Sequence, residues 1–60
     1  MSKQYHFIEA RNAVLGNRLV LWSLGNYVYE IDDRTSGKTF VFEADIEQAR
    51  KLFDEACASY

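Results

Sequence analysis

The chain has 60 residues, a formal net charge of −2, one cysteine and one histidine. This length gives a single domain with a small core, because a chain of this size buries only about 60% of the surface that its unfolded form exposes. The composition excludes an intramolecular disulfide, a structural zinc site and the basic stripe of a duplex-DNA-binding protein.

The first predicted element is one long strand. Residues 1–3 are expected to fray, and residues 4–10 have high β-propensity, with Tyr5 and Phe7 on one face. Arg11 and Asn12 interrupt this pattern and residues 13–15 resume it, which predicts a bulge near Arg11–Asn12 and a turn at residues 16–17. A short helical turn over residues 10–15 is the alternative.

Three further strands are predicted over residues 18–24, 27–32 and 38–43. Gly25–Asn26 is a two-residue link with glycine first, which indicates a type II′ hairpin. Residues 33–37 fit a type I turn closed by Gly37 in the left-handed region. The four strands together predict an antiparallel β-meander.

A helix is expected from Asp45 to about Cys57. Asp45 is a good N-cap, and Gln48 three residues later completes a capping-box pattern. The apolar stripe recurs at helical spacing and comprises Ile46, Ala49, Leu52, Phe53 and Ala56. Intrahelical ion pairs are expected for Arg50–Asp54 and for Lys51–Glu55. The predicted fold class is α+β, a four-stranded antiparallel meander followed by one C-terminal helix packed on one face.

One helix can cover only one side of this sheet, yet apolar residues point to both sides. The second strand places Leu19 and Leu21 on one face and Val20 and Trp22 on the other. A sheet with one wet face should alternate cleanly between apolar and polar residues. Because large exposed apolar patches mark interaction sites, the sequence predicts a docking surface.

No residue pattern indicates catalysis, a cofactor or a metal. The segment at residues 36–39 resembles the end of a phosphate-binding loop, but Asp32 stands where that loop needs glycine. His6 and Cys57 are the candidate residues for nucleophilic catalysis. Structural roles explain them better, with His6 as a strand residue and Cys57 as a small apolar residue. The carboxylates Glu30, Asp32, Asp33 and Glu43 flank the third hairpin and are explained by solvation, with a paired acid site as the alternative.

The pattern Tyr5-x-Phe-Ile-Glu-Ala-Arg11, followed by Gly16-Asn17, Leu21-Trp22, Asn26-Tyr27 and Asp32, covers about half of the chain. It resembles short uncharacterised proteins of phages and mobile elements. This resemblance implies no assigned activity, but it implies a setting in which small acidic proteins inhibit host machinery by binding it, anti-CRISPR proteins among them.

The leading hypothesis is therefore a non-catalytic, anti-CRISPR-like inhibitor that binds a host protein or ribonucleoprotein complex. Aromatic anchors and acidic side chains are the predicted partner-binding residues: Trp22, Tyr27, Tyr29, Glu30, Asp32, Asp33, Glu43, Glu47 and Asp54. No apolar run is long enough to span a membrane and the N-terminus lacks the apolar core of a signal peptide, which predicts a cytoplasmic protein that binds no membrane. The resemblance implies the host cell as its location, and the lack of a basic stripe predicts no binding to duplex DNA.

Two alternatives stay open. The first is a homodimeric interaction module whose uncovered face pairs with itself. The second is a single-stranded nucleic-acid binder, because residues 37–42 with Tyr27 and Tyr29 resemble an aromatic strand on which bases stack.

Overall fold

The computed structural model describes residues 4–60, so the expected fraying of residues 1–3 lies outside the described part. The elements are β1 (His6–Asn12), β2 (Arg18–Gly25), β3 (Val28–Asp33), β4 (Thr39–Glu43) and α1 (Ile46–Ser59). The four strands form one antiparallel sheet in the order β1-β2-β3-β4. The predicted α+β meander with a C-terminal helix is confirmed.

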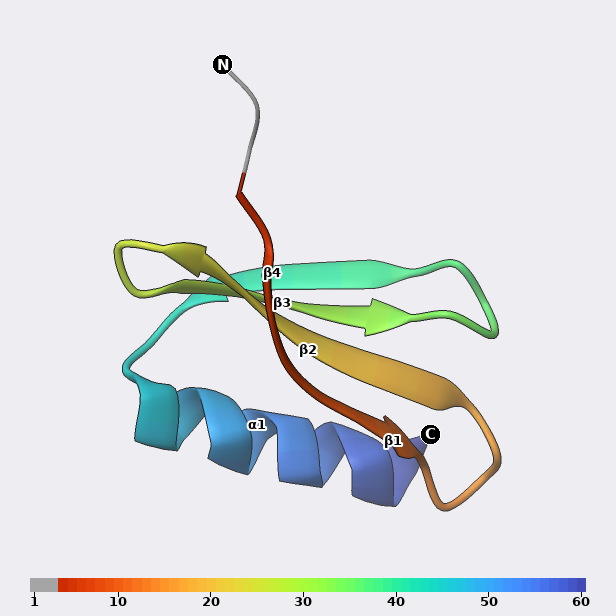
Figure 1. Cartoon of the computed structure of the whole chain (residues 1–60). Coiled ribbons are helices and arrows are strands. Elements are labelled where there is room, and N and C mark those ends of the chain that lie inside the picture. Colours follow the sequence, from red (N-terminus) through yellow and green to blue (C-terminus); the bar gives the residue numbers. More distant parts are fainter. Residues whose placement is uncertain (1–3) are drawn as a thin grey trace.

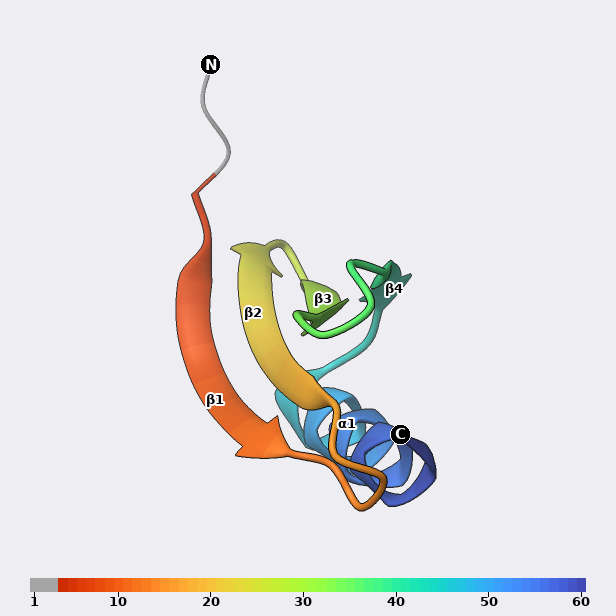
Figure 2. The same ribbon diagram turned by 90° about the vertical axis from the view of Figure 1, so that its right-hand side faces the viewer.

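The helix lies along one side of the sheet (Figure 1). Viewed from the end, β1 and β2 are strongly curved, and their ends nearest the β1–β2 turn lie beside α1 (Figure 2). The side of the sheet that faces away from α1 has no covering element among residues 4–60.

The core lies between the sheet and the helix. Alternate strand residues point to the same side of a sheet, so Leu19, Leu21 and Ile31 all face α1. The helix contributes Phe53, which is 0% exposed, together with Ala49 and Cys57. Full burial of one large apolar side chain of this kind stabilises a fold by about 1.5–3 kcal/mol.

The helix begins as predicted and ends later. The Asp45 carboxylate accepts a hydrogen bond from the Gln48 backbone N–H at 2.8 Å, which confirms the N-cap. The buried line follows steps of four residues through Ala49, Phe53 and Cys57. Ile46 falls three residues before Ala49, at the edge of that line, and is exposed. The prediction that Ile46 belongs to the buried stripe is wrong for this reason.

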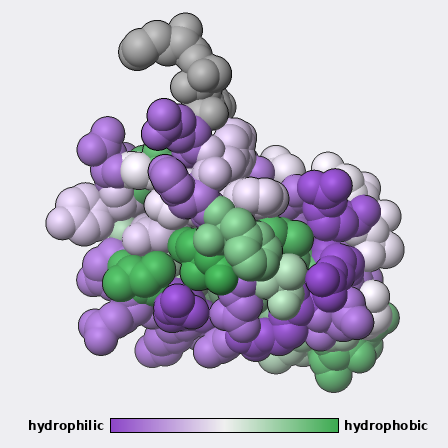
Figure 3. Space-filling view, viewed as in Figure 1, coloured by the Kyte–Doolittle hydropathy of each residue, from purple (hydrophilic) through white to green (hydrophobic). Residues whose placement is uncertain are grey.

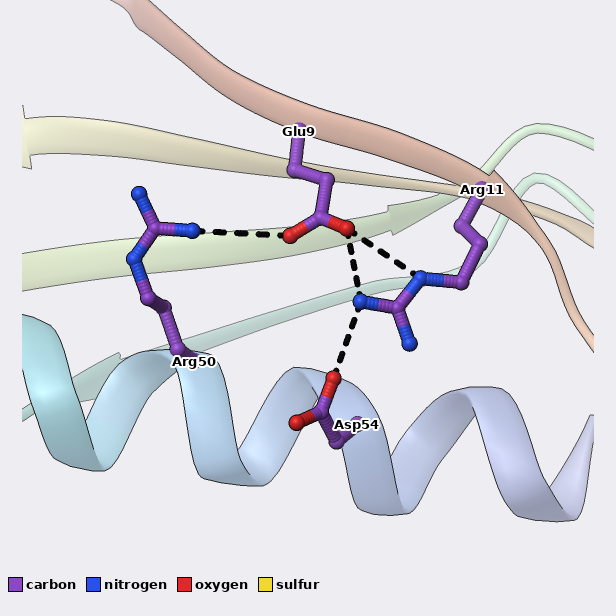
Figure 4. Close-up of polar contacts among 4 residues, drawn as sticks. All are labelled: Glu9, Arg11, Arg50 and Asp54. Atoms are coloured by element: carbon purple, nitrogen blue, oxygen red, sulfur yellow. Dashed lines mark hydrogen bonds and ion pairs between the residues drawn. The ribbon is translucent and has the colours of Figure 1, made fainter.

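The predicted ion pairs within the helix are not formed. Arg50 instead lies 3.6 Å from Glu9 of β1, and Asp54 lies 2.9 Å from Arg11 of the same strand (Figure 4). Arg11 also pairs with Glu9 at 2.6 Å, and its guanidinium lies 5.2 Å from the centre of the Phe53 ring. These contacts link the surface of the helix to β1.

The surroundings of Arg11 favour its charged form. The hydrogen bonds to Glu9 and Asp54 raise the pKa of this guanidinium still further above its usual range. Lys51 and Glu55 form no ion pair with each other in residues 4–60. The sequence prediction missed the cross-element pairs because Glu9 and Arg11 lie far from Arg50 and Asp54 in the sequence and only the fold brings them together.

The first strand is shorter than predicted, and its bulge lies elsewhere. The register of β1 against β2 shifts between Phe7 and Glu9, not at residues 11–12. After Asn12 the chain turns at once, because the Gly16 N–H donates to the Ala13 carbonyl at 2.9 Å. Neither the strand continuation through residues 13–15 nor a helix is formed there.

The β2–β3 hairpin has a two-residue turn, as predicted, but one residue further along. Gly25 pairs with Val28, so the turn residues are Asn26 and Tyr27. Both have positive φ, 52° and 62°, as a type I′ turn requires. The type II′ prediction on Gly25–Asn26 is therefore wrong, and it failed because a bulge at Leu24 moves Gly25 into the strand.

Candidate partner-binding surface

We call the side of the sheet that faces away from α1 the open face. Strand pairing gives its members as Phe7, Ala10, Val20, Trp22, Val28, Glu30, Asp32, Thr39, Val41 and Glu43. One row crosses all four strands, since Phe7 pairs with Trp22, Trp22 with Glu30, and Glu30 with Val41. Cross-strand neighbours on one face have side chains in contact range, so this row is a continuous surface.

Three rings form an aromatic cluster at the open face: Phe7 and Trp22, which belong to it, and Tyr5, which precedes β1. Trp22 lies 5.8 Å from Tyr5 and 5.9 Å from Phe7, ring centre to ring centre, with interplanar angles of 89° and 81°. Edge-to-face pairs of this kind are worth about 0.5–1.5 kcal/mol beyond the area they bury. They hold the rings in place, yet Phe7 remains 61% exposed and Val41 60% exposed.

Glu30 lies in the middle of this aromatic surface. The residue is only 9% exposed although no element covers its side of the sheet. The Tyr5 hydroxyl donates a long hydrogen bond to Glu30 Oε1 at 3.4 Å. No arginine or lysine of residues 4–60 lies within ion-pair distance of this carboxylate. Removing a carboxylate from water without pairing it with a cation costs free energy. Glu30 is therefore an unusual residue at the centre of an aromatic surface.

Two more predicted acidic residues share the open face with Glu30. Asp32 is the next residue on the same side of β3, and Arg34 Nη1 lies 3.3 Å from its Oδ2. Glu43 ends β4 and is exposed. The open face therefore combines exposed apolar groups with three carboxylates.

Tyr29 and Asp33, both predicted to bind a partner, are buried. Tyr29 faces α1 and stacks on Phe42 with ring centres 6.1 Å apart. Asp33 is 1% exposed and accepts hydrogen bonds from the Asn17 side chain at 2.8 Å and from the Thr35 N–H at 3.0 Å. The bond from Asn17 is the largest cause that lowers the pKa of Asp33, and burial opposes it. Asp33 therefore stabilises the turns and is not part of the open face.

The other predicted residues lie away from the open face. Glu47 and Asp54 are exposed on α1, on the opposite side of the sheet, and Asp54 is paired with Arg11. Tyr27 is 72% exposed at the tip of the β2–β3 hairpin, and its carbonyl accepts from the Ala44 N–H at 2.9 Å. The predicted set is thus divided, and Trp22, Glu30, Asp32 and Glu43 are the members that share one face.

The predicted partner-binding set lacks the exposed large apolar residues on and beside the open face, which are Tyr5, Phe7 and Val41. Alternation along the first strand did place Tyr5 and Phe7 on one face. It could not place them beside Trp22, because the bulge after Phe7 sets that register. One alternative predicted from the sequence is an aromatic stacking strand over residues 37–42, and Val41, between Phe40 and Phe42, is the residue of this strand that joins the open face beside Glu30.

The two candidate nucleophilic residues have ordinary surroundings. Cys57 lies in the core, and burial raises the pKa of its thiol. His6 is exposed at the start of β1. Residues 4–60 contain no group of three or more potential metal ligands and enclose no pocket.

A second apolar area lies apart from the open face. In the space-filling view, apolar colouring gathers near the centre and at the corner occupied by the β1–β2 turn (Figure 3). Val14 and Leu15 belong to that turn and are exposed. Their positions provide matched control sites for changes on the open face.

No protein-family model, no curated protein and no solved structure matches this chain. Within the described residues, no helix has the length and apolar character needed to cross a membrane.

Proposed function

We propose that this protein is a non-catalytic binding module that docks its open face onto another protein. The row of Phe7, Trp22, Glu30 and Val41 is the observation that supports the proposal most strongly. It offers exposed apolar surface around a half-buried tryptophan, and aromatic residues dominate binding hot spots. Its rings are fixed by mutual contacts before binding, so little side-chain entropy is lost on association.

The partner in this proposal is a host defence or nucleic-acid-handling complex, which the protein inhibits. The resemblance to short phage and mobile-element proteins supports the setting. The carboxylates of the open face support the chemistry, because acidic groups can meet the lysine and arginine side chains that otherwise hold nucleic acid. The action is that of an anti-CRISPR-like inhibitor in the host cytoplasm.

A homodimer through the open face is the second candidate, favoured by the exposure of Phe7 and Val41. Symmetric pairing of two open faces would place the acidic groups of both copies near one another, which opposes close contact. The single-stranded nucleic-acid alternative has less support, because Tyr29 and Phe42 of the expected stacking platform pack against the core.

The test is a phage plaque assay on a panel of bacterial strains, each carrying one defence system. The wild-type protein should restore plaques on at least one strain. The variant Phe7→Ser/Val41→Ser should lose this effect, whereas Val14→Ser/Leu15→Ser, which removes exposed apolar groups elsewhere, should keep it. Circular dichroism checks that both variants fold.

Two outcomes would contradict the proposal. One is that no strain responds to the wild-type protein. The other is that the open-face variant inhibits as well as the wild type does. Sedimentation velocity separates the candidates, since a tight dimer that the open-face variant dissociates would favour the homodimer.

A further inference from the structure

We propose that the open face binds an arginine side chain of the partner at its surface, with the Glu30 carboxylate as counterion and the rings of Tyr5, Phe7 and Trp22 as aromatic neighbours. This inference rests on the proposed docking of the open face and adds the chemistry that this surface recognises.

The first argument is the unused hydrogen-bonding capacity of Glu30. A carboxylate offers about four lone-pair sites, and here one oxygen accepts a single bond of 3.4 Å from Tyr5. Every buried side-chain oxygen in residues 4–60 has a hydrogen-bond partner. No residue among 4–60 donates a hydrogen bond to the second oxygen of Glu30, and this oxygen is not fully enclosed, so it is the atom to which an external donor would bind.

The second argument is the character of the neighbours. Tyr5 and Phe7 each form a T-shaped pair with Trp22, and Trp22 is the cross-strand neighbour of Glu30. A cation over an aromatic face gains about 0.5–1 kcal/mol at exposed sites and about 2 kcal/mol or more when it is desolvated. A carboxylate beside aromatic rings thus suits a cation that is also flat and weakly hydrated. Arginine meets these conditions better than lysine, because its planar guanidinium stacks on rings and pairs with carboxylates in a bidentate manner.

The third argument is the charge of the whole face. Glu30, Asp32 and Glu43 lie on it, and Arg34 is engaged with Asp32. The remaining acidic charge favours a basic partner surface over a second copy of this chain. It also disfavours nucleic acid, whose phosphates would be repelled.

Trp22 is the only tryptophan of the chain, so its fluorescence reports binding at this site. The probe is the capped pentapeptide Gly-Gly-Arg-Gly-Gly, and its control has citrulline, which is neutral and of nearly equal shape, in place of arginine. We expect a saturable change in Trp22 emission with the arginine peptide. The citrulline peptide should bind at least about tenfold more weakly than the arginine peptide. Glu30→Gln should weaken arginine binding about tenfold. Glu55→Gln, which removes one negative charge on α1 and away from the open face, should change it less than threefold.

Equal response to the two peptides, or no saturable response up to tens of millimolar, would overturn the inference. Unchanged arginine binding by a folded Glu30→Gln protein would do the same. If this variant does not fold, the comparison of arginine with citrulline on the wild-type protein decides alone. The plaque assay with Phe7→Ser/Val41→Ser is independent of these results, so a failed arginine site leaves the proposed docking face separately testable.

Discussion

The carboxylate of Asp33 accepts a hydrogen bond from the side-chain amide of Asn17 at 2.8 Å, and this bond joins two turns 16 residues apart in the chain. The β1–β2 turn and the β3–β4 turn therefore meet at one end of the sheet. The same carboxylate also accepts from the backbone N–H groups of Thr35 and Ser36. One buried acid thus fixes the geometry of both connections.

Stability should fall in acid because of this contact. The pKa of Asp33 is lowered in the folded state, mainly by Asn17. Its contribution is present above the ordinary aspartate pKa of about 3.9 and is lost as pH falls through the lowered folded value. Urea unfolding between pH 2 and 7 measures this loss. Asn17→Ala should flatten the acid limb and move the pKa of Asp33, followed by NMR, back toward its ordinary value. Asn12→Ala should leave both unchanged.

The core should depend on Phe53 more than on any phenylalanine at the surface. Phe53→Leu leaves a void between α1 and the sheet and should cost about 1–2 kcal/mol of the free energy of unfolding. The same change at the exposed Phe40 should cost within about 0.5 kcal/mol. Chemical denaturation measures both. An equal loss of unfolding free energy in the two variants would show that Phe53 is not packed in the core between α1 and the sheet.

Replacement of Tyr27 by glycine should stabilise the protein. Tyr27 has φ of 62°, a left-handed conformation that is unfavourable for an aromatic residue, and its exposed side chain loses little contact when removed. The turn becomes Asn-Gly, the preferred type I′ pair, and the gain should be up to about 1 kcal/mol. Tyr27→Ala keeps the strain and serves as control. A lower melting temperature for Tyr27→Gly would mean that the Tyr27 side chain stabilises the fold.

The ion pair between Arg11 and Asp54 should contribute little to the free energy of unfolding, and this contribution should fall as the salt concentration rises. Both side chains are partly exposed, so the coupling from a double-mutant cycle with Arg11→Gln and Asp54→Asn should be about 0.2–1 kcal/mol. It should shrink in 1 M NaCl, where the Debye length is about 3 Å. A coupling above about 2 kcal/mol that salt does not change would contradict the view that this is a surface pair.

The fold could be predicted from the sequence where local chemistry decides it. The alternation from Leu19 to Trp22, the Asp45 cap and the left-handed Gly37 all depend on a few neighbouring residues, and each is found where expected. The helix charges could not be predicted in the same way, because Arg50 and Asp54 find partners on β1, far away in the sequence.

The candidate surface was predictable only in part, for a similar reason. An apolar second face follows from Val20 and Trp22 by alternation alone. Which residues surround Trp22 depends on the bulge after Phe7, and a shift of one residue exchanges the two faces of a strand. Tyr29 was expected at the surface because the sequence could not indicate which face the helix covers, and α1 covers that of Tyr29.

Site-specific photocrosslinking tests the central claim most directly. The crosslinking residue p-benzoylphenylalanine replaces Val41 on the open face or, as a control, Leu15 in the β1–β2 turn, in cells of a strain that responds to the protein. An adduct with a subunit of the inhibited complex should form from position 41, and not from position 15. Adducts from position 15 alone, or from position 41 solely with a second copy of this chain, would contradict the claim.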